Sequence, residues 1–277
     1  MQARCTQAVL PVAGIESRFL PWTKIVPKEL LPIGNHPVIA LLIDECLSVG
    51  ISDICLIIGD GKEAIPRYFN PMPALERELE RRGKASMLSD LARYRNVRFH
   101  VLHQDTPLGD GHAVALAADW VRSTDVVAVL SGGDLISAED NGLQQLLSSY
   151  MELSSTSDAC LLALSEAARG ANATDELVRV EHGKARRARK VVGPVLAPPP
   201  LRESGILAYA GRALVPSSFF GALRAVASSV VPGTDHTFIR TLLSACGSTE
   251  VYGRVLDGVR FDVGTPLGYK QAVAVLA

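Results

Sequence analysis

The sequence has few of the features that mark secreted, membrane-spanning or zinc-binding proteins. Its five cysteines are scattered over 277 residues and form no CxxC pair, so we expect neither a disulfide framework nor a zinc site. No apolar run reaches the ~18 to 20 residues that a membrane span needs, and no signal peptide is evident near the N-terminus. These absences predict a soluble, cytoplasmic protein whose thiols are reduced.

The chain also carries almost no excess charge. Its formal net charge is −1, so no global basic field would attract nucleic acid or an anionic membrane surface. Hydrophobic residues make up 48% of the chain and charged residues 21%, which is typical of a folded globular protein and excludes extensive disorder. An anionic ligand would therefore have to be held by a local group of cations.

The first part of the chain, by contrast, is rich in alternating strand and helix patterns. Apolar runs at residues 7–13 and 53–59 predict buried strands, and His36 to Val49 between them has apolar residues at helical intervals. A strand, a helix and a second apolar strand are typical of a βαβ unit in a buried parallel sheet. Further strands are predicted at residues 97–103, 126–130 and 158–164, and further helices at 112–121 and 143–151.

The pattern changes after about residue 165. The predicted strands become short, and a basic stretch (Lys184 to Lys190) and a proline run (Pro198 to Pro200) interrupt them. The chain ends with a predicted helix at 217–230, strands at 250–255 and 259–261, and a last helix from Thr265. We predict an α/β fold: a doubly wound, mostly parallel, Rossmann-like mixed sheet with a smaller β subregion.

A cationic segment stiffened by prolines follows the first predicted strand. Residues 14–32 read GIESRFLPWTKIVPKELLP and contain Arg18, Lys24 and Lys28. Open α/β sheets bind ligands beyond the carboxyl ends of their strands, and fixed arginine and lysine side chains at such an edge suit a polyphosphate. The glycine spacing of a dinucleotide fingerprint and the GxxxxGK[ST] pattern of a P-loop are both absent. The alternative interpretation is a solvated basic loop.

This segment resembles the signature of sugar-1-phosphate nucleotidylyltransferases, above all the bacterial UTP–glucose-1-phosphate uridylyltransferases. From Arg18 onward the pattern R-x-L-P-x-T-K-x-x-P-K-E-x-L-P is complete. Other segments that resemble the family are residues 104–114 (QDTPLGDGHAV), Gly211-Arg212 and residues 261–269 (FDVGTPLGY). The resemblance covers nearly the whole chain and is weakest between about residues 165 and 203. It implies a single nucleotidyltransferase domain over residues 1–277, with a nucleotide-binding half (1–165) and a sugar-phosphate-binding half (166–277).

The resemblance implies an enzyme that makes an NDP-sugar and pyrophosphate from an NTP, with UTP expected first, and a sugar 1-phosphate. Arg18 and Lys28 would then stabilise the phosphates during transfer. The implied nucleotide-binding residues are Ala13, Gly14, Glu16, Lys28, Gln104, Gly109 and Gly111. The residues expected at the sugar phosphate are Lys190, Gly211 and Arg212. The acceptor would be glucose 1-phosphate or a modified sugar or cyclitol phosphate, and relatives of this kind tend to be homo-oligomers.

The resemblance also implies a Mg²⁺ ion held by two aspartates, since hard oxygen ligands are what Mg²⁺ prefers. Asp262 matches one of them. Counting without gaps from His112 places Gly132 at the other position, and a small insertion would place Asp134 there. We predict Asp262 and Asp134 as the ligands, and the alternative is that Asp134 only caps a turn.

The chain departs from the family pattern at three places. Glu16 stands where the family has a glycine, the family's Glu-Lys-Pro lysine has no clear counterpart, and its Tyr-Gly pair is absent near Asp175 to Leu177. The last two losses lie on the acceptor side, which favours an acceptor other than plain glucose 1-phosphate. The alternatives are a catalytically impaired, regulatory nucleotide-binding relative, a relative that uses another NTP, and an unrelated α/β enzyme.

Overall fold

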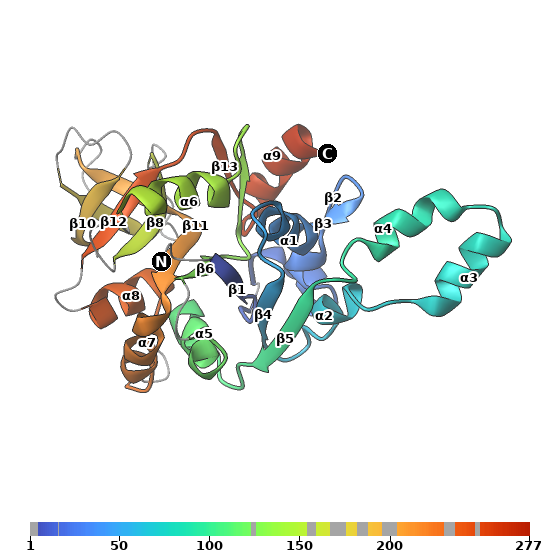
Figure 1. Cartoon of the computed structure of the whole chain (residues 1–277), viewed down its shortest axis with the longest axis horizontal. Coiled ribbons are helices and arrows are strands. Elements are labelled where there is room, and N and C mark those ends of the chain that lie inside the picture. Colours follow the sequence, from blue (N-terminus) through green and yellow to red (C-terminus); the bar gives the residue numbers. More distant parts are fainter. Residues whose placement is uncertain are drawn as a thin grey trace.

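A mixed sheet with helices on both faces organises the molecule (Figure 1). The computed structural model describes residues 5–15, 17–122, 126–153, 159–166, 176–181, 188–195, 204–229, 236–246 and 250–277. Within these residues the main sheet has the strand order β5-β4-β1-β6-β11-β8-β12-β10-β9. Its strands are β1 (Cys5–Pro11), β4 (Asp53–Ile58), β5 (Arg98–His103), β6 (Val126–Leu130), β8 (Cys160–Glu166), β9 (Leu177–Val180), β10 (Arg189–Pro194), β11 (Ile206–Pro216) and β12 (Val251–Val255).

The strands of the first half are parallel, as the βαβ patterns predict. β1 pairs in parallel with β4 on one side and with β6 on the other, and β4 pairs in parallel with β5. β11 enters antiparallel between β6 and β8, while β12 runs parallel to β8. The antiparallel β9 and β10 complete the smaller β subregion. The predicted α/β fold with a Rossmann-like mixed sheet is thus confirmed.

Helices cover the two faces because successive strand side chains point to opposite sides. Ala8 and Leu10 of β1 pack with α1, α6 and α9, whereas Val9 packs with α5, α7 and α8 on the other face. All three side chains are fully buried. The helices are α1 (Val38–Ser48), α2 (Ala64–Tyr68), α3 (Pro73–Arg81), α4 (Leu88–Ala92), α5 (Asp110–Leu116), α6 (Gly142–Leu153), α7 (Phe220–Ala227), α8 (Phe238–Cys246) and α9 (Pro266–Leu276).

Two smaller features bear on the site. The short strands β7 (Asp134–Ser137) and β13 (Val259–Asp262) form an antiparallel pair beside the main sheet. The helices α3 and α4 form an arm that projects from the body (Figure 1). None of the helices that the structure describes is long and apolar enough to cross a bilayer.

The structure differs from the predicted elements mainly in the second half. β11 spans eleven residues and continues to Pro216, although the strands in this part of the chain were expected to be short. Gly211 and Arg212 interrupt the apolar pattern, but the strand accommodates both because Gly211 adopts a φ of +73° and the Arg212 charge is paired inside the protein. The strand β7 and the helix α8 were not predicted.

Candidate active site

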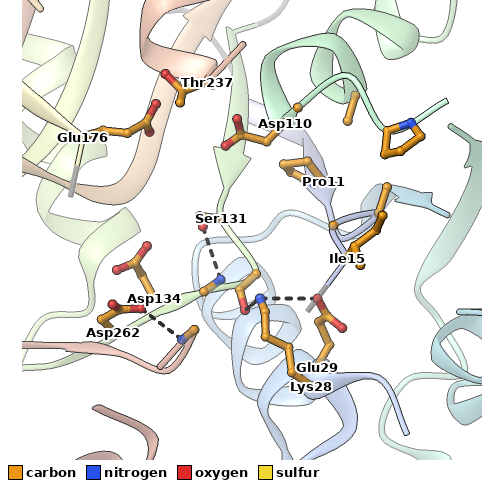
Figure 2. Close-up of a pocket in the computed structure, with 18 of the residues that line it drawn as sticks. Pro11, Ile15, Lys28, Glu29, Asp110, Ser131, Asp134, Glu176, Thr237 and Asp262 are labelled. Atoms are coloured by element: carbon orange, nitrogen blue, oxygen red, sulfur yellow. Dashed lines mark hydrogen bonds and ion pairs between the residues drawn. The ribbon is translucent and has the colours of Figure 1, made fainter. Parts of the chain in front are cut away.

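A pocket of about 490 Å³ opens at the carboxyl ends of β1 and β6, where the sheet rule predicts a ligand (Figure 2). It lies between the two halves of the sheet, and side chains from both halves line it. The predicted site residues that line it are Ala13, Gly14, Arg18, Lys28, Gln104, Gly109, Asp134 and Asp262. The structure therefore brings together segments that are far apart in the sequence.

The two aspartates predicted as metal ligands face each other across a strand pair. Asp134 of β7 is the direct register partner of Asp262 of β13, and both carboxylates lie side by side in the pocket wall (Figure 2). Burial and the negative charge of Asp134 raise the pKa of Asp262, while Arg260 and the Gly264 N–H oppose this shift. Two like charges at directly opposite positions repel each other, and a bound cation would relieve that repulsion.

Each of the two carboxylates has a hydrogen-bond partner within the protein. Arg260 donates from Nε to Asp134 Oδ1 at 2.6 Å, and the Gly264 N–H donates to Asp262 Oδ1 at 3.0 Å. Within the described residues, no group of three or more His, Cys, Asp or Glu could hold a metal. Two carboxylates completed by water and substrate phosphate match the way that proteins bind Mg²⁺, so the residues present fit this ion.

Two cations of the proline-rich segment reach the pocket. Lys28, in a short 3-10 helix (Lys28–Leu30), is nearly buried, and its Nζ donates to the Gly132 carbonyl oxygen at 3.3 Å. The Arg18 guanidinium donates to the Gly264 carbonyl oxygen at 3.3 Å. Since Gly264 follows Asp262 in the chain, Arg18 lies next to the predicted metal ligand. A triphosphate in this pocket would meet both cations.

Glu29 lines the pocket too, although it was not among the predicted site residues. Its carboxylate is fully buried and lies 3.4 Å from Lys28 Nζ and 3.1 Å from Lys62 Nζ. One carboxylate thus holds two ammonium groups beside the pocket, which leaves this cluster with one net positive charge for a ligand. The sequence could have indicated this residue, because Glu29 is the glutamate of the Pro-Lys-Glu pattern that matches the family.

Gln104 is held in one orientation by two acceptors. Its Nε2 donates to the Gly109 carbonyl oxygen at 2.9 Å and lies 2.9 Å from His112 Nδ1. Burial lowers the pKa of His112, so near pH 7 the ring is neutral and its Nδ1 accepts this hydrogen bond. Both amide hydrogens are therefore engaged, and the Gln104 carbonyl oxygen remains as the group that accepts from a ligand.

The comparison with known families agrees with this geometry. The model of the family described as nucleotidyl transferase matches residues 7–169, which is more than half of the chain. The chain belongs to the nucleotidyl transferase family. The Rossmann-like sheet, the cationic segment and the pocket between the two halves are thus features of a nucleotidyltransferase.

Individual relatives extend the similarity over the second half. This nucleotidyltransferase is 33% identical over 95% of its length to a UTP–glucose-1-phosphate uridylyltransferase of Bacillus subtilis, covering 88% of that protein. It is 30% identical over 98% of its length to the B. subtilis UTP–glucose-1-phosphate uridylyltransferase YngB, covering 89% of it. Among solved structures, the UTP-bound UGPase from Acinetobacter baumannii has a TM-score of 0.84 and 28% identity, with 98% and 93% of the two chains covered.

Several predicted acceptor-side residues lie elsewhere in this nucleotidyltransferase. The Arg212 side chain is fully buried and paired with Glu45, and it does not line the pocket. Lys190 lies on β10, where it pairs with Glu250 at 2.7 Å outside the pocket. Gly211 packs against the Asp134 side chain, which a Cβ would meet at 2.6 Å, and it therefore leaves room for that carboxylate.

The two glycines predicted at the nucleotide, Gly109 and Gly111, also allow close packing between helices. A Cβ at Gly109, whose φ is +95°, would overlap the His236 carbonyl oxygen, and a Cβ at Gly111 would overlap the Thr241 hydroxyl. Both glycines thus let the start of α8 pack against the start of α5, and only Gly109 of the two lines the pocket. Glu16, also predicted at the nucleotide, lies outside the described residues.

A second group of polar residues, two of them acids, lines the end of the pocket near α8, and we call it the acidic corner. It consists of Asp110, Glu176, Thr237 and Tyr209. Figure 2 shows the carboxylates of Asp110 and Glu176 pointing toward each other. Burial and the charge of Asp110 raise the pKa of Glu176 to about 8, although hydrogen bonds from the Thr237 side chain and the Ile239 N–H stabilise its charged form.

Proposed function

We propose that this nucleotidyltransferase transfers a uridylyl group from UTP to a sugar 1-phosphate and releases pyrophosphate. One observation carries the proposal: a single pocket is lined by the cations Arg18 and Lys28, the amide Gln104 and the opposed carboxylates Asp134 and Asp262. The names of the relatives, UTP–glucose-1-phosphate uridylyltransferase, support UTP and a hexose phosphate as substrates.

The fixed amide of Gln104 supports a uracil base. Its engaged Nε2 leaves a carbonyl oxygen that only accepts. Uracil presents a ring N–H at N3, which donates to such an oxygen. Cytosine has an acceptor lone pair at the same position, so a cytosine ring would place two acceptors against each other. Leaving such a group unpaired costs about 1–3 kcal/mol, which discriminates between the two pyrimidines.

The cations and carboxylates support transfer at the α-phosphorus. An oxygen of the acceptor phosphate forms a bond to the α-phosphorus of UTP, and the bond from that phosphorus to its β-bridging oxygen breaks, so that pyrophosphate leaves with the bridging oxygen. Arg18 and Lys28 stabilise the charge that develops on the phosphate oxygens. Asp134 and Asp262 would hold Mg²⁺, which when bound supplies further charge neutralisation and orients the phosphates.

The proposal is tested with a matrix of nucleotides and sugar phosphates. The purified protein is mixed with Mg²⁺, each of UTP, dTTP, CTP, ATP and GTP, and each of several sugar 1-phosphates, and pyrophosphate release is followed. We expect release with UTP to exceed release with CTP. Tight binding of UTP without release for any acceptor would instead identify a regulatory, catalytically impaired relative, an interpretation that the ion pair between Arg260 and Asp134 favours.

A further inference from the structure

The roles proposed for the cations, the amide and the opposed aspartates do not involve the acidic corner. Its four side chains come from separate parts of the chain: Asp110 begins α5, Glu176 precedes β9, Tyr209 lies on β11 and Thr237 precedes α8. The packing of α8 against α5 brings them together. They share the pocket with Asp134, whose charge also acts on Glu176.

Backbone N–H groups at the start of α8 donate to both carboxylates of this corner. The Phe238 N–H donates to Asp110 Oδ1 at 2.8 Å, and the Ile239 N–H donates to Glu176 Oε1 at 3.3 Å. A carboxylate offers about four lone-pair sites on its two oxygens. Glu176, which also accepts from the Thr237 side chain, can therefore accept from a further donor.

The Tyr209 hydroxyl is a second, independent observation that points to a polar ligand. The side chain is 5% exposed, and its hydroxyl has no hydrogen-bond partner among the residues that the structure describes. Tyr209, Glu176 and Asp110 line the same pocket, and burial, followed by the charges of the two acids, raises the pKa of Tyr209. Because an unpaired buried polar group is costly, this hydroxyl calls for a polar atom supplied by the ligand.

We propose that the acidic corner binds a protonated amino group on the sugar of the acceptor, so that the acceptor is an amino-sugar 1-phosphate with a free amine. The inference rests on the proposed function, which places a sugar phosphate in this pocket. An ammonium group brings three N–H donors and a positive charge to Asp110, Glu176 and Tyr209, whereas a sugar hydroxyl brings one donor and no charge. An N-acetyl group lacks the charge, and a uronic acid would be repelled.

The kinetic test compares acceptors that differ only in the amine. With UTP and Mg²⁺, kcat/KM is measured from pyrophosphate release for glucose 1-phosphate, for amino-deoxyglucose 1-phosphates with the amine at each ring position in turn, and for their N-acetyl forms. Since a hydrogen bond to a charged group is worth about tenfold to a hundredfold in affinity, we expect one free amine to exceed both controls by about tenfold or more.

Two variants assign that preference to the acidic corner. In Glu176→Gln, the ratio of kcat/KM for the preferred amine to that for glucose 1-phosphate should fall toward one. In Asp119→Asn, which alters an exposed carboxylate paired with Arg224, the ratio should stay as in the wild type. Rapid pyrophosphate release with glucose 1-phosphate and no preference for any amine would overturn the inference while leaving the proposed function intact.

A binding measurement keeps the inference testable if the enzyme releases no pyrophosphate at all. Isothermal titration calorimetry with the amino-sugar 1-phosphates, in two buffers of different ionisation enthalpy near pH 7, counts the protons exchanged. We expect an amine to displace the proton that Glu176 carries, so the wild type releases protons and Glu176→Gln does not. Failure of every amine to bind more tightly than glucose 1-phosphate would overturn the inference, whereas missing turnover alone would overturn the proposed function.

Discussion

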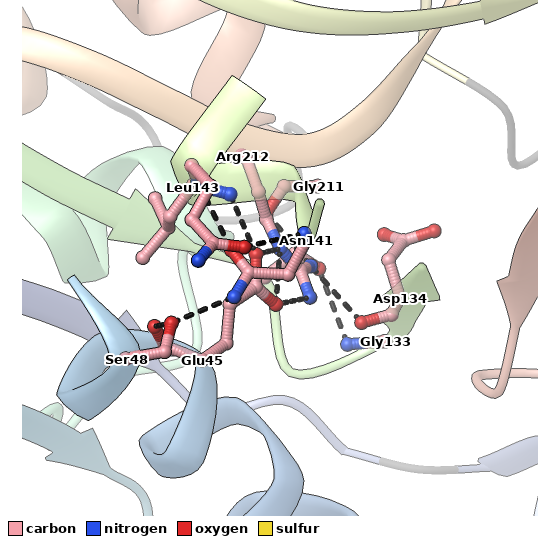
Figure 3. A network of polar contacts seen from close by, with 10 residues as sticks. Glu45, Ser48, Gly133, Asp134, Asn141, Leu143, Gly211 and Arg212 are labelled. Atoms are coloured by element: carbon pink, nitrogen blue, oxygen red, sulfur yellow. Dashed lines mark hydrogen bonds and ion pairs between the residues drawn. The ribbon is translucent and has the colours of Figure 1, made fainter. Parts of the chain in front are cut away.

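Arg212 and Glu45 form a two-pronged ion pair inside the protein, with Arg212 Nη2 2.6 Å and Nε 3.1 Å from the two carboxylate oxygens of Glu45 (Figure 3). Glu45 Oε1 also accepts the Leu143 N–H at 2.9 Å, and Arg212 Nη1 donates to the Asp134 carbonyl oxygen at 3.0 Å. The pair thus connects α1, α6 and β11 with the backbone of a predicted metal ligand. Burial alone would lower the pKa of Arg212, but the charge and hydrogen bonds of Glu45 outweigh it and raise that pKa.

Removal of the carboxylate from this pair should strongly destabilise the fold. Glu45→Ala leaves the Arg212 cation buried without its partner, which costs about 3–5 kcal/mol of unfolding free energy. The double variant Glu45→Leu, Arg212→Met should recover part of that loss, because a buried ion pair can be replaced by apolar side chains of similar volume. Urea denaturation measures both. Glu78→Ala, which breaks an exposed ion pair with Arg81, is the control and should cost less than about 1 kcal/mol.

The buried position of Arg212 shows which parts of the site can be predicted from a sequence and which cannot. Arg18, Lys28 and Asp262 lie within contiguous motifs near the ends of predicted strands, and the sheet rule places such residues at the pocket. Arg212 also lies in a matched motif, but the pattern shows a cation without its partner. Glu45 lies 167 residues earlier in the chain, and only the packing of α1 against the sheet brings the two together.

The acidic corner escaped prediction for the same physical reason. Asp110 stands in a matched segment and Glu176 in a weakly matched one, and neither pattern indicates that the two carboxylates meet. Their approach depends on α8, whose first residues pack against Gly109 and Gly111. The helix itself was missed, so no sequence argument could have placed its backbone donors beside these acids.

Removal of the Lys28 ammonium should reduce catalysis far more than it reduces binding of the base. Lys28→Ala removes a nearly buried cation that contacts the Gly132 carbonyl oxygen in the pocket wall. Loss of one such electrostatic group costs about a hundredfold to a thousandfold in kcat. Lys24→Ala, on an exposed lysine of the same segment, should change kcat less than about threefold if its cation is screened by solvent. Pyrophosphate release with UTP measures both, and equal losses in the two variants would contradict the assignment.

Neutralisation of Asp262 should lower the activity without lowering the stability of the metal-free protein. In Asp262→Asn the repulsion from Asp134 disappears, so without metal the variant should be as stable as the wild type or more stable. The sign agrees with its raised pKa: an acid whose folded pKa lies above its unfolded value loses stability as the pH rises through that folded pKa. Thermal melts in EDTA test this expectation.

Addition of Mg²⁺ and UTP should reverse the order of the melting temperatures of the wild type and Asp262→Asn. The wild type should gain melting temperature with Mg²⁺ and UTP, because a ligand that binds only the folded state stabilises it. Asp262→Asn should gain little and should lose most of its activity. Asp257→Asn, on an exposed carboxylate next to β12, should behave as the wild type. A full Mg²⁺ response in Asp262→Asn would exclude this residue as a metal ligand.

The contact between His112 and Gln104 should control which pyrimidine is accepted, and its effect should depend on pH. Because burial lowers the pKa of His112 below 6.5, the ring is neutral at pH 7.5 and accepts from Gln104 Nε2. Below the folded pKa the ring is charged, the acceptor is lost, and the amide is free to turn. For the same reason the unfolded state binds this proton more readily, so stability rises with pH between the folded pKa and 6.5.

The ratio of kcat/KM for UTP to that for CTP should therefore be high at pH 7.5 and fall in acid. His112→Ala should lower the ratio severalfold at pH 7.5 and remove its acid dependence. The control is His103→Ala, which alters an exposed histidine on the neighbouring strand and should keep both the ratio and its pH profile. An unchanged profile in His112→Ala would show that another group orients the amide.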